Sequence, residues 1–595
     1  MSVGATSEKR SLRVCWGALV VALAFALFTT FGIEFDFGFD ASRSIWGNIK
    51  THAPRTIACL LVSFACYYVI VERLYRAIDR VQPVAKNPVQ APRVRDWLVY
   101  VVILALAWIP YAIVCYPASS TGYDYFWQLT QGMGVFPLAQ HHPVFGSLVY
   151  GLLYRIGFAL GGTANAGLFF TTLFQIAFMA AAIGFALVTL RAFNCPRVLR
   201  IVLLVFFALC PVYAGHAVWL IKDSLFASAG CILFVQFFWW THSVRGTAPN
   251  VWLASLPAVV VMAVVFSLIR NGALPVAALL FVVLAVYSMC LCGRRQLKGI
   301  VAGLVVLVVA TQAWGAALTH AGAYPGSIRE ALATPSRQVV NTLRLHPNAI
   351  NAEEKALLLD VYEIRGDSLD KLIAKYDYRG ADPIRTGYFE GKTGLVDFLK
   401  LWAKLGIKHP GAYADAALRG SYGYWWPLFD ATKVLHPTPF FNPKTDFGPE
   451  GLKNKMIKEG SGPAVHIFIL AGLPVDETYV DYAATQNPDI VGIFDAQTKN
   501  EAALTALNAA MTKLKQAPVL SVFLAPGIYV FVLLFAIGYL VSRRRTGALL
   551  FPLLLIVLIA CLSPVNPYMR YALPFVVLAP FLLGTCFTDE FSDTV

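Results

Sequence analysis

Long apolar runs separated by short polar segments occupy the chain from residue 14 to 318 and again from 519 to 588. A helix of about 20 apolar residues satisfies its own backbone hydrogen bonds inside the hydrocarbon layer of a membrane. The pattern therefore predicts an all-α, polytopic membrane protein with about 12 transmembrane helices. The expected spans are 14–33, 56–71, 97–117, 166–190, 201–220, 224–241, 251–269, 273–291, 299–318, 519–541, 547–562 and 572–588.

Lys and Arg gather in alternate loops, at 73–95, 191–200, 294–298 and 543–545. By the positive-inside rule these loops face the cytoplasm, and twelve spans with both termini inside satisfy all four. A further apolar run, 144–160, carries Arg155 and would break this alternation if it crossed the membrane. We expect it to form a juxtamembrane or re-entrant helix on the outer surface.

The only large polar region, 319–518, falls on the outside in this topology. Helical periodicity at 353–362 and 501–514 predicts a largely helical domain, and the Pro- and Gly-rich stretch 436–451 predicts a long loop within it. The chain then has three parts. They are an N-terminal membrane domain of about nine spans (1–318), an extracytoplasmic soluble domain (319–518) and a C-terminal membrane domain of three spans (519–595).

Composition supports this interpretation, since 58% of the residues are hydrophobic and only 14% are charged. The net charge of +14 would suit nucleic acid, but the basic residues lie between spans and not on one soluble face. We therefore expect the lipid bilayer as a partner and no nucleic acid.

An outer segment, 122–146, brings Asp124, His141 and His142 to the membrane boundary among aromatic residues. Charge near hydrocarbon is costly and is usually kept for pairing or function. One interpretation makes Asp124 a general base, with the histidines binding phosphate or metal. The alternative is an interfacial aromatic belt with a helix-capping aspartate. Under the first interpretation, Tyr123, Tyr125, Phe126 and Trp127 are expected to lower the local dielectric and raise the pKa of Asp124.

Three cations, Lys222, Arg270 and Arg570, stand at outer span ends and are expected to form a phosphate pocket together. The alternatives are that Lys222 pairs with its neighbour Asp223 and that each Arg is a snorkelling membrane anchor. In the outer domain, Trp425 and Trp426 offer aromatic surface. Such surface either stacks on an acceptor sugar or packs the domain onto the membrane.

At these positions the sequence resembles the GT-C superfamily of polytopic glycosyltransferases, which take sugars from polyprenyl-phosphate or polyprenyl-pyrophosphate donors. The resemblance is carried by GYDYFWQ (122–128) with HHPVFG (141–146), KDS (222–224), RNG (270–272) and NPYMRYALP (566–574). The outer domain is similar to a poorly characterised bacterial branch of these proteins. That similarity lies in ADPIRTGYF (381–389) and HPGAYADAALRGSYGYWWP (409–427).

The resemblance implies an enzyme that transfers a sugar to a cell-envelope glycan or lipid acceptor at the outer face of a bacterial inner membrane. Asp124 would be the base, and the three cations would bind the donor phosphate. The supporting residues would be His141, His142, Asp223 and Tyr571, with Trp425 and Trp426 binding the acceptor. No motif assigns a cofactor, and dependence on a divalent cation is left open.

One departure from the family concerns the acid. GT-C members commonly place it in the first outer loop, which here is 34–55 and contains Glu34, Asp36 and Asp40. Two rival functions also remain at this point. One is an O-antigen-type polymerase or ligase, and the other is a lipid or glycan transporter or flippase.

Overall fold

The computed structural model describes most of the membrane-domain helices and part of the outer domain. The described residues are 15–37, 40, 42–81, 88–119, 123–134, 137–292, 296–326, 332–362, 368–374, 376, 394–434, 436, 500–543, 550–563 and 565–588. The motif at 381–389 lies outside these ranges, as does the expected loop 436–451 apart from its first residue.

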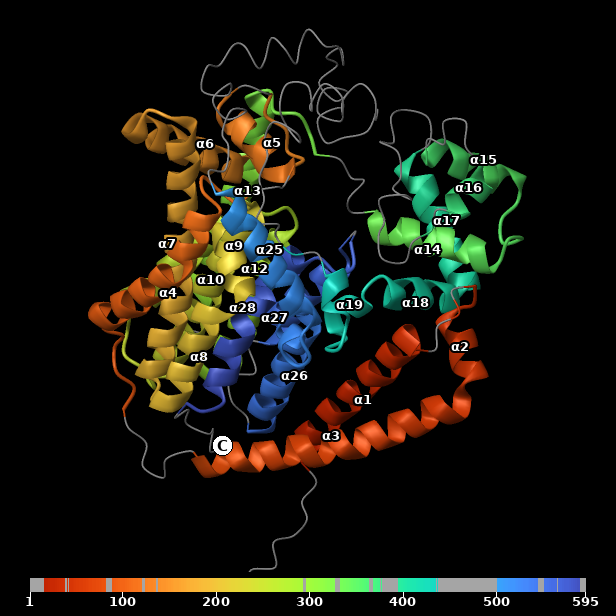
Figure 1. Ribbon diagram of the computed structural model, residues 1–595, viewed down its shortest axis with the longest axis horizontal. Coiled ribbons are helices and arrows are strands. Elements are labelled where there is room, and N and C mark those ends of the chain that lie inside the picture. The colour runs from red at the N-terminus through yellow and green to blue at the C-terminus, as the bar shows by residue number, and fades with distance from the viewer. Residues whose placement is uncertain are drawn as a thin grey trace, which may run out of the picture.

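Each of the twelve apolar runs coincides with a helix or with a pair of helices (Figure 1). The helices are α1 (Trp16–Phe37), α3 (Ala53–Val81), α4 (Val94–Val114), α7 (Ala164–Ala192), α8 (Arg197–Leu209) with α9 (Pro211–Val218), α10 (Lys222–Val244), α11 (Leu256–Ile269), α12 (Ala273–Tyr287), α13 (Leu297–His320), α26 (Pro526–Ser542), α27 (Leu550–Cys561) and α28 (Met569–Thr585). The part of the chain that the structure describes contains no β-strand, so the fold is all-α there.

Among the described residues, eight helices are long and apolar enough to cross a membrane, and the pair α8 and α9 makes a ninth if it is one span. Four more apolar helices are shorter, namely α11, α26, α27 and α28. These lengths and compositions suit a multi-pass membrane protein, and the number twelve stays a prediction. The pair α8 and α9 bends by 52°. Pro211 explains the bend, because its ring removes an N–H donor and disfavours helical backbone at Cys210.

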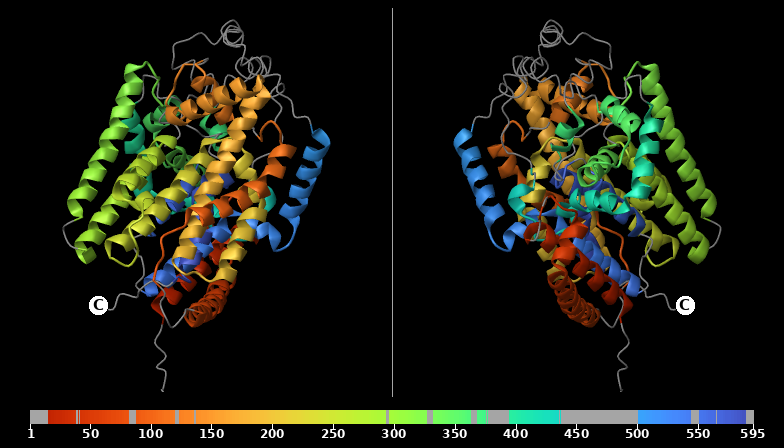
Figure 2. Two further views of the ribbon diagram at one scale, coloured as in Figure 1. Left: turned by 90° about the vertical axis from the view of Figure 1, so that its left-hand side faces the viewer. Right: turned by 90° about the vertical axis from the view of Figure 1, so that its right-hand side faces the viewer.

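Helix α10 lies at the centre of the bundle and packs against α7, α11 and α28 (Figure 2). It runs parallel to α7, because contacts between the two helices advance together along both chains. Cys231 donates to the Ala182 carbonyl, and nearer the ends of the helices Trp239 donates to Thr189 at 2.8 Å. The start of α7 and the start of α10 therefore point to the same side of the protein.

The additional apolar helix, α6 (Val144–Gly161), returns along the first part of α7. Tyr150 of α6 meets Gln175 at 3.1 Å, and Gly157 lies so close to Gly167 that a side chain at 157 would collide with it. Gly162 makes the reversal possible because its φ of +66° is left-handed. Both α6 and the first third of α7 thus lie towards the α10 start. Helix α6 is long and apolar enough to cross a membrane, so its placement outside the spans stays a prediction.

The described part of the outer domain has a core of its own. It contains α14 (Ala333–Leu345), α15 (Ala352–Val361), α16 (Leu369–Ala374), α17 (Leu395–Lys408) and α18 (Pro410–Arg419), which lie beside the main bundle in Figure 1. Val339, Leu358 and Phe398 are buried between these helices. Helices occur where periodicity predicts them, at α15, which begins with an Asn351 capping box, and at α25 (Glu501–Gln516).

Candidate active site

A largely buried ion-pair cluster centres on Asp124, in the first turn of α5 (Tyr123–Gly132). One carboxylate oxygen, Oδ2, accepts from Lys222 Nζ at 2.8 Å and from Arg570 Nη1 at 2.9 Å. The three side chains are between 13% and 18% exposed. Lys222 begins α10 and Arg570 stands in the first turn of α28, so segments 98 and 446 residues away meet at one carboxylate.

The local backbone explains how Lys222 reaches this position. Residues Trp219 and Ile221 are extended, and Leu220 N–H donates to the Ser119 carbonyl at 3.1 Å, which ties the α10 start to the chain just before α5. A cation at a helix N-terminus faces the positive end of the helix dipole. Lys222 therefore depends on the carboxylate of Asp124 for compensation.

His142 joins the cluster from the turn before α6. Lys222 Nζ lies 3.2 Å from His142 Nδ1, and since the ammonium can only donate, Nδ1 accepts and the proton of the neutral ring is on Nε2. Burial, together with the charge of Lys222, holds the pKa of His142 well below its usual value. His141 stacks edge-on against His142, with 4.7 Å between ring centroids.

A second ion pair joins Arg270, at the end of α11, to Asp223. Tyr571 links the two pairs, because its hydroxyl accepts from Arg570 at 2.9 Å while its ring lies 5.1 Å from the Arg270 guanidinium. Lys222 thus pairs with Asp124 and Asp223 pairs with Arg270, so the two neighbours do not pair with each other. The arginines are paired and largely buried, which does not fit the snorkelling-anchor alternative.

The cluster holds three cations (Lys222, Arg270 and Arg570, hereafter the site cations) against two carboxylates, with His142 neutral. One positive charge is in excess. The sequence predicted a raised pKa for Asp124, and this prediction is wrong in direction. Burial does raise the pKa, but the charges of Lys222 and Arg570 outweigh it and hold the pKa well below its usual range.

The outer domain fixes the loop that leads into α28 and Arg570 (residues 565–568, hereafter the Arg570 loop). In α19 (Tyr422–Trp425), the Tyr424 hydroxyl donates to the Val565 carbonyl at 2.7 Å and accepts from Tyr568 N–H at 3.0 Å. Gly423 N–H donates to the Asn566 side chain at 3.0 Å. Sequence reasoning missed Tyr424 and Asn566 as site residues. Both lie inside motifs that carry the resemblance, but nothing in the sequence pairs segments about 140 residues apart.

Trp425 and Trp426 are 6% and 2% exposed. Trp426 Nε1 donates to Asp36 at 2.6 Å, and the ring of Trp425 packs against Phe28 of α1. These contacts favour the alternative in which the pair fastens the outer domain to the membrane helices. Their role in acceptor binding stays a prediction.

The acids of the first outer loop have other partners. Glu34 is buried and pairs with Arg55 at 2.8 Å, Asp36 accepts from Trp426, and Asp40 is about half exposed. Within the described ranges, none of their hydrogen bonds or ion pairs involves a site cation. This geometry favours Asp124 over the first-loop acids as the group that could act beside a bound phosphate.

No cluster of three or more His, Cys, Asp or Glu side chains with metal-binding geometry is found in the described part of the chain. Dependence on a divalent cation therefore stays open.

A family model described as "Family of unknown function (DUF6020)" matches residues 134–593. The match includes Lys222, Arg270 and Arg570 and begins after Asp124. No curated protein and no solved structure matches the chain significantly.

Proposed function

The chain belongs to DUF6020, a family of unknown function, and we propose that it is a GT-C-type glycosyltransferase of the bacterial inner membrane. It would transfer a sugar from a polyprenyl-phosphate donor to a cell-envelope glycan or lipid acceptor at the outer face. The observation that carries the proposal is the carboxylate of Asp124, held between Lys222 and Arg570 where three helices begin.

The charge of the cluster supports a phosphate ligand. Three cations and two carboxylates leave one positive charge in excess in a largely buried setting. A sugar joined to a polyprenyl chain through one phosphate is a phosphodiester with one negative charge, whereas a pyrophosphate diester carries two. Because uncompensated buried charge is costly, the balance supports a monophosphate donor.

The low pKa of Asp124 has a consequence for the reaction. Phosphate oxygens entering the cluster compete with Asp124 for Lys222 and Arg570. As these cations turn to the phosphate, the pKa of the carboxylate rises, because burial persists while the opposing charges move away. Asp124 thus becomes a stronger base when the donor is bound.

The reaction then follows from this arrangement. The acceptor hydroxyl attacks the anomeric carbon, its proton passes to Asp124, and the bond between that carbon and the phosphate oxygen breaks. The electron pair leaves on the phosphate, where the site cations stabilise the charge.

Orphaned polar atoms also support ligand binding at this place. Among the described residues, His142 Nε2, Asp223 Oδ2 and Arg570 Nε are buried without a hydrogen-bond partner. Buried polar atoms are normally hydrogen-bonded. His142 Nε2 and Arg570 Nε are donors suited to phosphate oxygens, and Asp223 Oδ2 is an acceptor suited to a sugar hydroxyl.

A narrow apolar crevice lies beside Arg270. It lies between α10, α12, α27 and α28 and is lined by Phe226, Val276, Ile556, Ile559 and Pro574. Its accessible space is only about 10 Å³, about that of one water molecule, so a prenyl chain fits there only when these helices part.

Binding of a polyprenyl monophosphate to the purified full-length chain tests the proposal. Lys222→Gln and Arg570→Gln should each weaken binding at least tenfold. Arg43→Gln, which removes an exposed arginine whose side chain pairs with Asp40 and Thr51 among the described residues, should leave binding unchanged. The corresponding prenyl alcohol should bind poorly to all forms. Equal phosphate-lipid binding by wild type and both cluster variants would overturn the proposal.

A further inference from the structure

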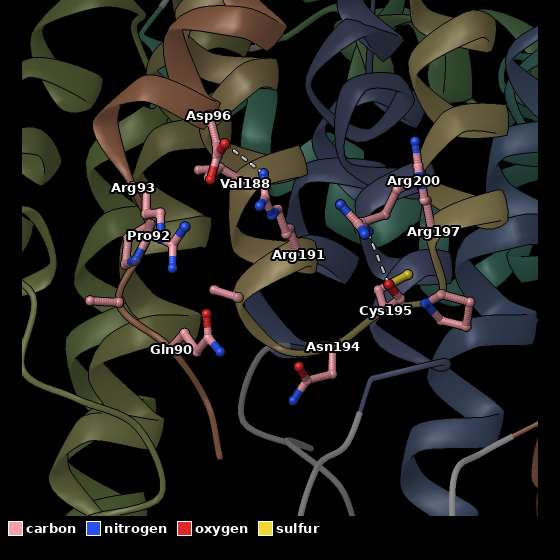
Figure 3. Close-up of a pocket in the computed structure, with 13 residues that line it drawn as sticks. Gln90, Pro92, Arg93, Asp96, Val188, Arg191, Asn194, Cys195, Arg197 and Arg200 are labelled. Atoms are coloured by element: carbon pink, nitrogen blue, oxygen red, sulfur yellow. Dashed lines mark hydrogen bonds and ion pairs between the residues drawn. The ribbon is translucent and has the colours of Figure 1, made fainter. Parts of the chain in front are cut away.

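A polar cavity opens between α4, α7 and α8 (Figure 3). Its volume is about 340 Å³, within the roughly 300–1,000 Å³ typical of small-ligand pockets. Four arginines line it, Arg93, Arg191, Arg197 and Arg200, and Asp96 is the one acidic residue in its described lining.

This cavity lies at the opposite end of the bundle from Asp124. Arg191 is in the last turn of α7, and the ring of Phe193 just after it packs against Trp239 and His242, near the end of α10. Lys222 begins α10, about 20 residues earlier. At about 1.5 Å per residue the two sites are about 30 Å apart, which is the thickness of a hydrocarbon core.

The positive charge of the cavity is only partly compensated. Arg191 pairs with Asp96 at 2.6 Å. Arg200 donates to the Cys195 carbonyl at 2.9 Å and to the Tyr100 hydroxyl at 3.2 Å, which are neutral acceptors. Arg93 and Arg197 contact no carboxylate of the described residues. In the described lining, four guanidinium groups therefore stand against one carboxylate, and Figure 3 shows them distributed around the cavity.

Backbone donors add to this field. Helices α4 and α8 both begin at the cavity, with Arg93 and Pro196 as their N-cap residues, and neither helix has a side-chain cap. The first N–H groups of a helix attract anions. The cavity thus combines the charge of the arginine side chains with the partial positive charge of two helix N-termini.

Exposed apolar side chains follow directly after the lining residues of the cavity on α4 and α8. Val94 and Val198 are 69% and 74% exposed, and Leu98 and Ile201 continue the exposed apolar surface one turn further along α4 and α8. On helices that suit a membrane, such surface contacts acyl chains. A ligand with an anionic head and an apolar tail matches both parts.

We propose that the cavity between α4, α7 and α8 binds the headgroup phosphate of an anionic phospholipid, with the acyl chains along the exposed faces of α4 and α8. Basic pockets between helices on the cytoplasmic side are suited to such headgroups. The site is separate from the Asp124 cluster and does not rest on the proposed sugar transfer.

The test titrates the detergent-purified full-length chain with short-chain phosphatidylglycerol or phosphatidylcholine. Thermal unfolding gives the melting temperature, and native mass spectrometry gives the number of bound lipids. The double variant Arg93→Gln/Arg197→Gln changes the cavity. The matched control Arg80→Gln/Arg95→Gln removes two exposed arginines that do not line it.

Phosphatidylglycerol should bind wild type and the control variant at least tenfold more tightly than the cavity variant, and phosphatidylcholine should bind all three weakly. Equal loss in both double variants would show a general surface charge effect and overturn the site. Inorganic phosphate and glycerol 3-phosphate distinguish the source of the phosphate. If they bind as tightly as the lipid, the cavity is a site for a soluble phosphate and the lipid assignment is wrong.

Discussion

Replacing Asp124 by Asn should change donor binding and catalysis in opposite directions. The amide keeps the size of the side chain and one oxygen acceptor, but it removes the negative charge that Lys222 and Arg570 share. The excess charge of the cluster rises from one to two, and the phosphate no longer competes with a carboxylate for these cations.

The magnitude follows from Coulomb's law. Two anions bound to the same cations lie about 6 Å apart, and at an effective dielectric constant of about 20 their repulsion is about 3 kcal/mol. The side chains are 13% to 18% exposed, so solvent screening reduces this value, and we expect donor binding to tighten at least tenfold. Loss of a general base lowers kcat by roughly a hundredfold, or about 2.7 kcal/mol.

The assay measures polyprenyl monophosphate binding and sugar transfer on the same preparation, with the melting temperature as a control for folding. Asp124→Glu is the matched variant, because it retains the charge and should keep donor affinity near that of wild type. Weaker donor binding by Asp124→Asn would refute the competition between carboxylate and phosphate. Near wild-type transfer by Asp124→Asn, with inactive Glu34 or Asp40 variants, would move the base to the first outer loop.

Four further outcomes can be checked separately. Tyr424→Phe removes two hydrogen bonds to the Arg570 loop and should lower transfer about tenfold with weaker donor binding, whereas Tyr413→Phe, which loses one hydrogen bond inside the outer domain, should not. His142 has a lowered pKa in the folded protein, so below about pH 6.5 the unfolded chain takes up a proton that the folded one does not, and stability falls with acidification. The drop in melting temperature between pH 7.5 and 5.5 should therefore be smaller in His142→Gln; an identical drop would contradict this. Trp426→Phe loses the hydrogen bond to the first outer loop and should cost roughly 1 kcal/mol of stability without raising the acceptor KM, and a raised KM with unchanged stability would restore the acceptor-binding role. A cysteine at the exposed position Lys400 in an otherwise cysteine-free chain should react with an impermeant reagent from the outside, and labelling only from the cytoplasm would reverse the topology.

The helices were predictable from the sequence because an apolar run encodes its own helix. Pro211 even marked the point where the run 201–220 bends. The charge of the loops predicts that α6 lies outside the spans, since the alternation of Lys and Arg leaves no room for another crossing, and this placement stays a prediction because α6 is long enough to cross a membrane. The sequence could not show how α6 packs, because the contact of Gly157 with Gly167 exists only after the chain reverses at Gly162.

The sequence predicted which residues make up the candidate site, but it did not predict which carboxylate pairs with which cation. The predicted topology places Asp124, Lys222 and Arg570 on the same side of the membrane. Hydrogen bonds between positions 446 residues apart, however, depend on tertiary packing. The pKa of Asp124 was mispredicted for the same reason. Its aromatic neighbours are adjacent in sequence and were weighed, whereas the two cations that decide the sign are distant in sequence.

The attachment of Tyr424 and Gly423 to residues 565–568 also bears on biogenesis. The ribosome synthesises α19 about 140 residues before its hydrogen-bond partners. Helices α14 to α18 can pack as soon as they are synthesised, since their core is their own. Helix α19 must wait for its partners until the loop between α27 and α28 has been synthesised. Quality control in the membrane would therefore see an outer domain with an unfinished edge in any chain that stops before α28, even when its own core is complete.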